Sequence, residues 1–557
     1  MRFKSISSDL LVTIVTLVAA FAAVTAAMAF DEPAPGFERY NQAYPEPYAY
    51  PLAQNTARVS VASEGTQANL FSYYSSISAD GRYVAFESLA SNLVAGDTNG
   101  HHDVFVHDRQ TNETTRVSVT SDGTEANGYS RRPSISADGR YVAFASWASN
   151  LVAGDTNEMP DIFIHDRQTG ETTRVSVASD GAQANNDSMS PQSISADGRY
   201  VAFVSYASNL VVGDTNGHRD VFVHDRQSGE TTRVSVASDG AQANSVPEDP
   251  RISADGRYVA FASYASNLVV GDTNESWDVF VHDRQTGETT RVSVASDGSQ
   301  SDGGGSWSPT VSANGRYVAF TSYASNLVAG DVNFSADIFV HDRQSGETTR
   351  VSVTSDGTQA NSESYNASIS DDGRYVAFES YAGNLVSGDT NMKGDIFVRD
   401  ILTGETIRIP NSPSGFQANG SSHDPAISGD GRVITFPSSA SNLVAGDTNS
   451  FDDVFVYDKL GKTAPADGAT AVPLSPTLSW QASASAASYE YCYSSIPGPC
   501  TKWNSVGSDT SVTLSGLAAN YTYYWQARAV NPGGVVEADN GIWWSFKIGR
   551  ASCRERV

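Results

Sequence analysis

The chain has 557 residues, with 63 Asp and Glu against 36 Lys and Arg, and its formal net charge at pH 7 is −27. Such an acidic surface repels phosphate backbones, so we expect no nucleic-acid partner. The acidity suits a protein that is soluble outside the cell, and it is compatible with weak binding of divalent cations.

The amino terminus carries an export signal. Arg2 and Lys4 precede an uncharged apolar stretch over residues 10–30, with small residues at Ala27 and Ala29. This pattern is typical of a signal peptide, so we expect residues 1–29 to be removed and the rest to be secreted, held at the cell surface or kept in the periplasm. The alternative is a retained membrane anchor, because the stretch is just long enough to cross a bilayer. No second long apolar run follows, so we expect no membrane span after removal of the signal.

A repeat of 58 or 59 residues follows a Pro- and Tyr-rich linker at residues 30–56. The turn glycine of a Ser-x-Asp-Gly-Arg element recurs at Gly81, Gly139, Gly198, Gly256, Gly315, Gly373 and Gly431. In the first unit we expect four short strands at 76–78, 83–86, 104–106 and 115–119, which we call strands a, b, c and d. Strands b and c are apolar almost throughout, as in a sheet that is covered on both faces.

The strand count predicts a closed ring. Strands a, b and c occur seven times, but no strand d follows the last strand c at residues 454–458. A sequence that matches strand d stands alone at residues 57–62, ahead of the first strand a, where it would complete the last sheet and leave no exposed edge. We therefore expect an all-β, seven-bladed β-propeller over residues 57–460, closed by its amino-terminal strand.

The repeated motifs also carry a family resemblance. Ser-Ile-Ser-Ala-Asp-Gly-Arg-Tyr-Val-Ala-Phe, followed by Asp-Val-Phe-Val-His-Asp-Arg, resembles the PD40 repeat of TolB-like propellers over residues 57–458. The chain departs from that family in having Ala where the family has Pro before Asp-Gly, and in its long b–c loop. The resemblance implies the fold and leaves the function open, because this architecture hosts enzymes and interaction modules alike.

Residues 461–548 resemble a fibronectin type III domain, a β-sandwich. Trp480 matches the buried tryptophan of that family, and Tyr523 falls at its tyrosine corner. Cys492 and Cys500 form a candidate disulfide in an exported protein, which leaves Cys553 unpaired. Residues 549–557 look like the translation of a sequencing adapter and are left out of the fold prediction.

The b–c loops carry a repeated Gly-Asp-Thr-Asn-x-x-x-Asp element that suggests a metal. Two carboxylates and an amide oxygen are ligands that Ca²⁺ takes, although the element lacks the later Glu of an EF-hand loop. Structural turns explain the same residues without a metal, and no cofactor is required by the sequence. The calcium candidates are Asp97, Asn99, Asp103, Asp155, Asn157, Asp161, Asp214, Asn216, Asp220, Asp272, Asn274, Asp278, Asp331, Asn333, Asp337, Asp389, Asn391, Asp395, Asp447, Asn449 and Asp453.

A histidine at the same place in strand c of five units offers a second metal candidate. His107, His165, His224, His282 and His341 lie on different blades, too far apart to share one ion, so we expect local packing instead.

One face of the predicted ring varies from unit to unit. The d–a and b–c loops share that face, and exposed aromatic and arginine side chains there are typical of interface anchors. The candidate ligand-binding residues are Tyr73, Tyr74, His102, Tyr129, Arg131, Arg132, Trp277, Trp307, Phe334 and Tyr365. Loop packing is the alternative explanation for part of this set.

These observations favour a monomeric, exported binding or scaffolding protein that holds a protein or glycan on the variable face. The chain has no Gly-x-Ser-x-Gly nucleophile elbow, and we assign no catalytic residue. The alternative is an extracellular carbohydrate-active enzyme, a lyase or glycosidase, that uses non-repeated residues of the same face.

Overall fold

The computed structural model describes residues 56–409, 417–481, 486–497, 502–531, 534–538 and 543–550. The predicted signal peptide, residues 30–55 of the linker, Cys500, Cys553 and the rest of 551–557 lie outside this part. Among the described residues, no helix is both long and apolar enough to span a membrane.

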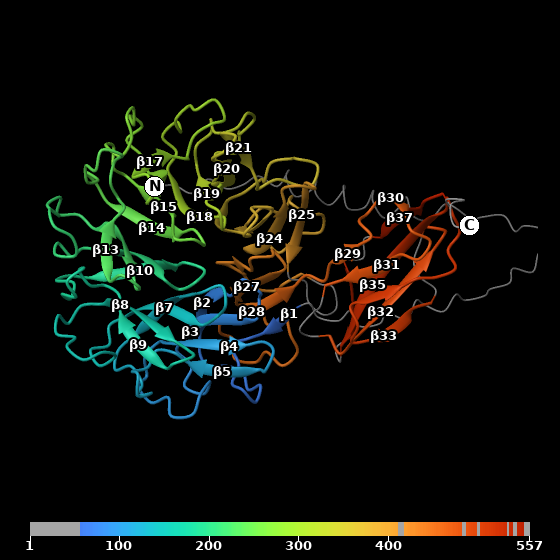
Figure 1. Ribbon diagram of the computed structural model, residues 1–557, viewed down its shortest axis with the longest axis horizontal. Helices are drawn as coiled ribbons and strands as arrows, with labels where there is room; N and C mark the ends of the chain where they lie inside the picture. The colour runs from blue at the N-terminus through green and yellow to red at the C-terminus, as the bar shows by residue number, and fades with distance from the viewer. Residues whose placement is uncertain are drawn as a thin grey trace, which may run out of the picture. The chain divides into compact units, whose positions relative to one another are not determined.

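The described residues 56–458 form seven four-stranded antiparallel sheets, each a blade of a β-propeller (Figure 1). Blade 1 contains β2 (Ser72–Ile77), β3 (Tyr83–Ser88), β4 (Asp103–Asp108) and β5 (Glu113–Arg116). Blade 2 contains β6 (Ser130–Ile135), β7 (Tyr141–Ser146), β8 (Asp161–Asp166) and β9 (Glu171–Arg174). Blade 3 contains β10 (Ser188–Ile194), β11 (Tyr200–Ser205), β12 (Asp220–Asp225) and β13 (Glu230–Arg233).

The remaining blades follow in chain order. Blade 4 contains β14 (Pro247–Ile252), β15 (Tyr258–Ser263), β16 (Asp278–Asp283) and β17 (Glu288–Arg291). Blade 5 contains β18 (Ser306–Val311), β19 (Tyr317–Ser322), β20 (Asp337–Asp342) and β21 (Glu347–Arg350). Blade 6 contains β22 (Ser364–Ile369), β23 (Tyr375–Ser380), β24 (Asp395–Asp400) and β25 (Glu405–Ile409). Blade 7 contains β26 (Ala426–Ile427), β27 (Val433–Ser438), β28 (Asp453–Asp458) and β1 (Thr56–Arg58).

The chain's first described strand completes its last blade, as the strand count predicts. β1 pairs antiparallel with β28, and Arg58 lies opposite Phe455. At the end of the ring that carries the a–b turns, a circle of backbone hydrogen bonds links the blades. Ala79 N–H donates to Ala137 O at 3.0 Å, and each blade repeats the bond until Gly429 N–H donates to Ala79 O at 3.0 Å. The ring is therefore closed by backbone contacts as well as by strand pairing.

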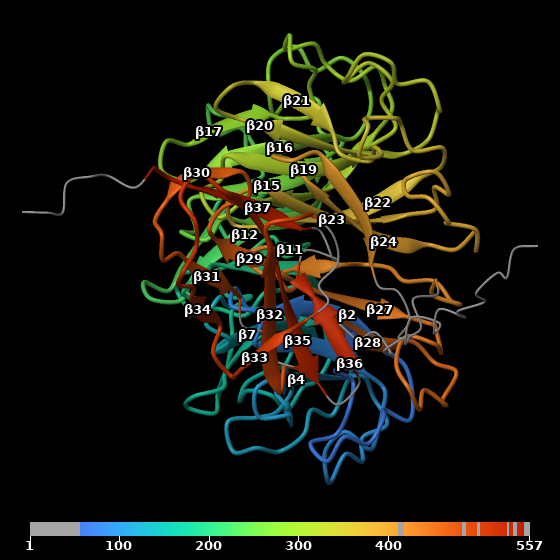
Figure 2. The same cartoon turned by 90° about the vertical axis from the view of Figure 1, so that its right-hand side faces the viewer.

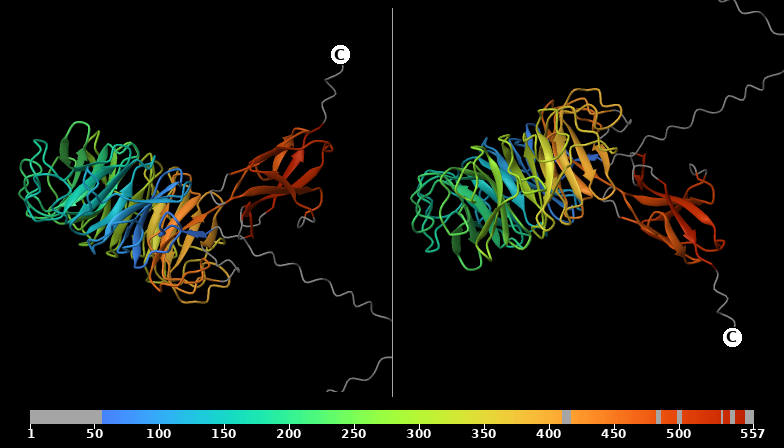
Figure 3. Two further views of the ribbon diagram at one scale, coloured as in Figure 1. Left: turned by 90° about the horizontal axis from the view of Figure 1, so that it is seen from below. Right: turned by 90° about the horizontal axis from the view of Figure 1, so that it is seen from above.

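The core lies within and between the blades, which pack side by side in the views of Figure 3. The second and third strands of each blade are almost wholly buried, which confirms that both faces of the sheets are covered. A cross-strand pair of phenylalanines recurs in every blade, as at Phe144 and Phe163, whose ring centroids are 6.1 Å apart. The same two aromatic side chains therefore pack against each other in every blade.

The a–b and c–d turns form one end of the propeller, which we call the constant end. Gly139 in an a–b turn has φ of 73°, and a Cβ there would overlap the ring of Tyr83 in the preceding blade. The guanidinium of Arg167 lies 4.5 Å from the centroid of the same ring, and its Nη1 donates to Gly139 O at 2.7 Å. In blades 2 to 7 the turn glycine covers a tyrosine of the preceding blade in this way, and in blade 1 Gly81 covers Val433 instead.

The d–a and b–c loops form the opposite end, which we call the variable end. Ser88, the last residue of β3, pairs with both Ser72 and Asp103, the first residues of β2 and β4. The predicted grouping of these loops on one face is therefore confirmed.

Strand d is shorter than predicted. β5 ends at Arg116, and Val119 makes only an isolated bridge to Glu125. Val117 N–H still donates to Val104 O, but beyond it the Ser118 hydroxyl accepts from Val104 N–H and Ser118 O accepts from Ala126 N–H, so the backbone pairing with β4 ends. β1 is short for the same reason, since Val61 bridges only to Gln67.

Residues 461–550 form two further sheets (Figure 2). One contains β29 (Lys462–Ala464), β31 (Thr477–Trp480) and β34 (Ser511–Thr513). The other contains β30 (Ala469–Val472), β37 (Trp544–Ile548), β35 (Thr522–Asn531), β32 (Ser488–Ser494), β33 (Asn504–Gly507) and β36 (Gly534–Glu537). Side chains of both sheets share one core around Trp480 and Trp525.

Two features of this β-sandwich match the fibronectin type III resemblance. Trp480 is buried, and Ala518 N–H donates to the Tyr523 hydroxyl oxygen at 2.9 Å, a local link of the tyrosine-corner kind. The family assignment itself stays a prediction.

Candidate functional site

A bulge in the innermost strand of the blades gives the variable end its individual residues. In β2 the pairing with β3 shifts between Tyr73 and Ser76, and Tyr74 has φ of 42°. A bulge re-aims the side chain at the point where pairing is interrupted. Equivalent positive φ values occur at Arg132, Asp249, Ser308, Asn366 and Asp424. Each of these six residues lines the same cavity.

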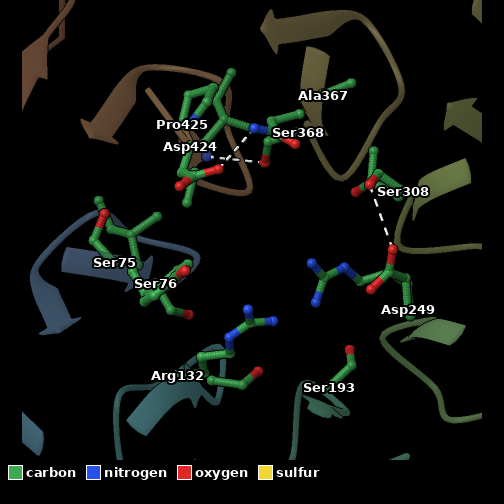
Figure 4. A pocket seen from close by; sticks show the side chains of 18 of the residues that line it. Ser75, Ser76, Arg132, Ser193, Asp249, Ser308, Ala367, Ser368, Asp424 and Pro425 are labelled. Atoms are coloured by element: carbon green, nitrogen blue, oxygen red, sulfur yellow. Dashed lines mark hydrogen bonds between the residues drawn. The ribbon is translucent and has the colours of Figure 1, made fainter. Parts of the chain in front are cut away.

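That cavity, of about 490 Å³, lies where the inner strands of the blades face one another (Figure 4). Its volume is in the range of small-molecule sites. The bulge residues differ in size, charge and hydrogen-bonding capacity, although the strands that carry them are built from one repeat. We call this space the central cavity. It is the place where non-repeated polar side chains converge, as the enzyme alternative and the binding hypothesis both require.

Asp424 is the centre of a hydrogen-bonded group on one side of the cavity. Asn366 Nδ2 donates to Asp424 Oδ1 at 2.7 Å and to Glu379 Oε2 at 3.2 Å. His423 Nδ1 lies 3.1 Å from Asp424 Oδ2. Burial opposes a charge on His423, but the hydrogen bond to Asp424 and nearby carboxylates outweigh it and raise the pKa of His423. Burial and the charge of Asp424 raise the pKa of Glu379.

Arg132 stands on another side of the cavity. Its backbone N–H donates to Glu87 Oε2 at 2.9 Å, and its guanidinium lies 4.7 Å from the ring centroid of Tyr74. His102 Nδ1 lies 3.2 Å from the other oxygen of Glu87. The predicted candidates Arg132 and His102 therefore meet at one buried carboxylate, and Tyr74 joins them through the Arg132 guanidinium.

A second cavity of about 280 Å³ opens beside the first, lined by residues of blades 2, 3 and 4. Arg132 and Asp249 line both cavities, so the two are neighbours. The second cavity adds the apolar side chains of Met189 and Val204 and the exposed ring of Tyr206. It offers an apolar surface next to a polar one.

Five aromatic side chains stand at the variable end, each directly after the second strand of its blade. Trp147, Tyr206, Tyr264, Tyr323 and Tyr381 are between 38% and 45% exposed. We call them the aromatic arc, since they occupy equivalent positions in blades 2 to 6, where blades 1 and 7 have Leu89 and Ser439. Their strands end opposite the starts of the cavity-lining strands, as at Ser146 and Ser130. The cavity-lining residues lie further along these strands, from the bulge residues towards the a–b turns, so the arc stands at the variable end and the central cavity lies deeper between the blades.

Several predicted candidates pack against the arc. Trp277 contacts Tyr264 edge to face, with ring centroids 6.2 Å apart. Trp307 lies 5.4 Å from Tyr323 by the same measure, and the hydroxyl of Tyr323 is 3.0 Å from that of Tyr365. Trp277, Trp307 and Tyr365 thus pack against exposed rings of the aromatic arc, which was not among the predicted candidates.

The remaining candidates lie apart from the central cavity or at its edge. Arg131 lies over the ring of Tyr129 at 5.3 Å, next to His101 and His102. Tyr73 stacks on Phe71 at 5.6 Å. Phe334 is 89% exposed on its b–c loop and does not line either cavity.

Of the residues that line the central cavity, the sequence analysis named only Tyr74 and Arg132. Asp249, Arg251, Ser308, Asn366 and Asp424 were not among the candidates. Their signal was present, because each bulge residue that the structure describes in full stands seven positions before a turn glycine, as 74 stands before 81 and 132 before 139. Aligning the repeats and looking for the column that varies would have found them.

The repeated Asp and Asn residues of the b–c loops form an ion-pair network instead of an open cluster. Arg116 Nη1 lies 3.4 Å from Asp97 and 3.3 Å from Asp103, and Ser118 and Asn99 donate to Asp103. The same arrangement recurs around Arg58, Arg174, Arg233, Arg291, Arg350 and Arg408. Burial, with a contribution from Asp103, raises the pKa of Asp97 to about 6.

A guanidinium thus already pairs with both carboxylates in each blade. Among the described residues, no group of three or more His, Cys, Asp or Glu side chains is placed to hold a metal ion. These contacts favour structural turns over calcium, and calcium binding itself stays a prediction.

The repeated histidines pack locally, as expected. His165 Nδ1 lies 2.9 Å from Thr172 Oγ1, and burial lowers the pKa of His165 to about 4. Cys492 is buried and disulfide-bonded. Its predicted partner, Cys500, lies outside the described residues, so the pairing stays a prediction.

Comparison with known proteins gives only distant likenesses. No protein-family model matches the chain, and no curated protein matches it. Among solved structures, a protein assigned as TolB in Agrobacterium tumefaciens is 15% identical with a TM-score of 0.32, over 50% of this chain and 80% of its own. A GH74 xyloglucanase from Xanthomonas campestris is 10% identical with a TM-score of 0.39, over 76% and 59%. The periplasmic gluconolactonase of Pseudomonas aeruginosa is 18% identical with a TM-score of 0.30, over 61% and 84%.

These TM-scores are all below 0.5, so no functional argument rests on them. The described residues form a β-propeller of repeated blades, with a polar cavity that residues outside the repeat pattern line between the inner strands.

Proposed function

We propose that the protein is an exported binding protein that holds a saccharide at the variable end of its propeller. The observation that carries this proposal is the combination of a polar central cavity with the aromatic arc, which Tyr206 connects to it through the second cavity. A pyranose ring presents C–H groups on its faces and hydroxyl groups around its edge. Aromatic rings fit the faces, and carboxylates, amides and guanidinium groups fit the hydroxyls.

The arrangement supports a chain of sugars better than a single one. The central cavity has room for a terminal sugar, and the neighbouring cavity beside Tyr206 offers an apolar wall for the next. The five exposed rings recur once per blade, so an oligosaccharide leaving the cavity would meet further aromatic surfaces. A protein ligand anchored by the same rings is the other outcome that the test below can return.

The test measures saccharide binding by calorimetry, after a glycan array has identified oligosaccharides that bind. We expect the double variant Tyr264→Ala/Tyr323→Ala to lose at least tenfold in affinity, a change of roughly 1.4 kcal/mol. Tyr521→Ala is the matched control, because Tyr521 is 58% exposed but belongs to the β-sandwich, and its affinity should equal that of the wild type. An array without saccharide hits, or a double variant that binds as tightly as the wild type, would overturn the proposal.

A second candidate function is cleavage of the bound saccharide. The group of Asp424, His423 and Glu379, linked through Asn366, favours it. The hydrogen bond to Asp424 and nearby carboxylates raise the pKa of His423, and burial with the charge of Asp424 raises the pKa of Glu379. Incubation with the binding oligosaccharides, followed by chromatography of the products, tests it. Turnover that Asp424→Asn abolishes would support an enzyme, and intact oligosaccharide after prolonged incubation would leave binding alone.

A further inference from the structure

Arg251 interrupts the repeat at the level of the central cavity. It stands two residues after the bulge residue Asp249 and lines the cavity. Small side chains occupy the equivalent position in the other blades: Ser76, Ser134, Ser193, Thr310, Ser368 and Ala426. The small residues leave the space open, and the one large side chain brings a positive charge into it.

The guanidinium of Arg251 has no hydrogen-bond or ion-pair partner among the described residues. The acidic residues of the cavity, in contrast, are engaged by their neighbours. Asp424 is bonded to Asn366 and His423, and the Ser308 hydroxyl lies 3.4 Å from Asp249. Three charges act on Arg251 from nearby elements: Asp249 and Asp424 favour its charged form, and Arg132 opposes it.

Leaving this guanidinium unpaired is unfavourable. Burial lowers the pKa of Arg251, because the cavity wall replaces part of its hydration. A buried charge without a hydrogen-bonded partner costs free energy, and a ligand that supplies the partner recovers that cost on binding. Hydroxyl groups would satisfy single N–H groups, whereas a carboxylate matches the two parallel donors of a guanidinium and its charge.

We propose that the central cavity selects an acidic saccharide, with the carboxylate of a uronic acid residue paired to Arg251. This inference rests on the proposed saccharide binding and adds the chemical class of the sugar that enters the cavity. Arg132, on the rim shared by the two cavities, adds positive charge along the path of an anionic sugar. The engaged carboxylates Asp249 and Asp424 remain as acceptors for the hydroxyl groups of the same sugar.

The test compares pairs of oligosaccharides that differ only in the carboxyl group. Oligosaccharides that contain glucuronate, galacturonate or mannuronate are titrated against wild-type protein, together with their carboxyl-reduced counterparts. We expect at least one acidic member to bind at least tenfold more tightly than its reduced counterpart. Arg251→Gln should bring both members of that pair to the same affinity, and Arg251→Lys should keep part of the preference.

Controls separate this effect from a loss of structure. Arg251→Gln should melt no lower than the wild type, because no partner of Arg251 is lost. Arg199→Gln removes an arginine that pairs with Asp225 at the constant end, and it should leave the preference for acidic sugars unchanged.

The outcomes distinguish the two proposals. Equal affinity of wild-type protein for every acidic and reduced pair would overturn the uronate inference and leave saccharide binding in place. A preference that persists in Arg251→Gln would also overturn it. If a sulfated oligosaccharide binds through Arg251 more tightly than every carboxylated one, the uronate inference is overturned, and the group that pairs with Arg251 is a sulfate. Binding of an acidic peptide through Arg251, with no saccharide bound, would overturn both proposals.

Discussion

The two ends of the propeller are built from the same repeat but behave differently. At the constant end the contacts repeat closely: the turn glycines of blades 2 to 7 lie against a tyrosine of the preceding blade, and in blades 2 to 5 an arginine covers the same ring. At the variable end, the bulge residues change from blade to blade and line one cavity. Residues that repeat in all blades pack the blades against one another, and residues that differ between blades are the ones available to contact a ligand.

The largest expected effect tests whether the repeated Arg–Asp network is structural. Arg233→Met leaves Asp214 and Asp220 without their cation, and Asp220 is fully buried. We expect the free energy of unfolding to fall by about 3–5 kcal/mol, as when one partner of a buried ion pair is removed. Urea denaturation measures it.

Arg199→Met is the matched control in the same blade. Arg199 pairs with Asp225, but its side chain is 37% exposed, so water replaces the lost contact. We expect a loss of about 1 kcal/mol or less. Equal losses in the two variants would contradict a special role for the network.

A substitution in the a–b turn tests the packing of the constant end. Gly198→Ala combines φ of 72° with overlap between the new Cβ and the ring of Tyr141. We expect a loss of roughly 3 kcal/mol from strain and overpacking together. Gly181→Ala has φ of 84° but no atom within 4 Å of its Cβ, so only about 1 kcal/mol should be lost. Thermal melts of both variants would show whether overlap with the ring of Tyr141 adds to the loss of stability.

Acidification probes a buried histidine of the repeat. Burial lowers the pKa of His165 from 6.5 to about 4, so between these values the unfolded chain binds a proton that the folded chain does not. Stability therefore falls as pH decreases from 6.5 towards 4, by roughly 1.4 kcal/mol for each pKa unit at most. His165→Gln removes this term, and the difference in unfolding free energy between wild type and variant should shrink from pH 7.5 to pH 5. A constant difference would show that His165 is not held neutral.

The smallest expected effect concerns metal removal. Because Arg116 and its equivalents already occupy the space between the paired carboxylates as their cation, EDTA should leave the melting temperature unchanged within about 1 °C. A metal that binds only the folded state would raise the midpoint, so a clear decrease on adding EDTA would revive the calcium prediction.

The sequence predicted the ring well because its evidence was repeated in every unit. The spacing of the turn glycines, the apolar strands b and c and the orphan strand at the amino terminus all pointed to the same closed sheet arrangement, and the pairing of Arg58 with Phe455 agrees. The end of strand d was wrong: Val117 to Val119 look like a strand, but only Val117 bonds to strand c, while Ser118 O accepts from Ala126 N–H and Val119 bridges to Glu125.

The site was predicted only in part, for a physical reason. Tyr74 and Arg132 were named because aromatic and arginine side chains stand out in a loop. Asp249, Asn366 and Asp424 did not stand out, because their role depends on a bulge that turns them towards a shared cavity. Whether the residue at that position points inward follows from backbone geometry and not from residue type.

Pairing of the first strand with the last blade has a consequence for biosynthesis. Ser60 and Asp453, which share a buried hydrogen bond, are 393 residues apart. As the chain emerges from the ribosome, β1 must wait for β28 before its edge is paired, so the ring stays open until almost all of the blades have been made. Open sheet edges invite association with other chains. A chaperone that shields this edge until release would therefore act at the last step of folding, when the two ends of the ring meet.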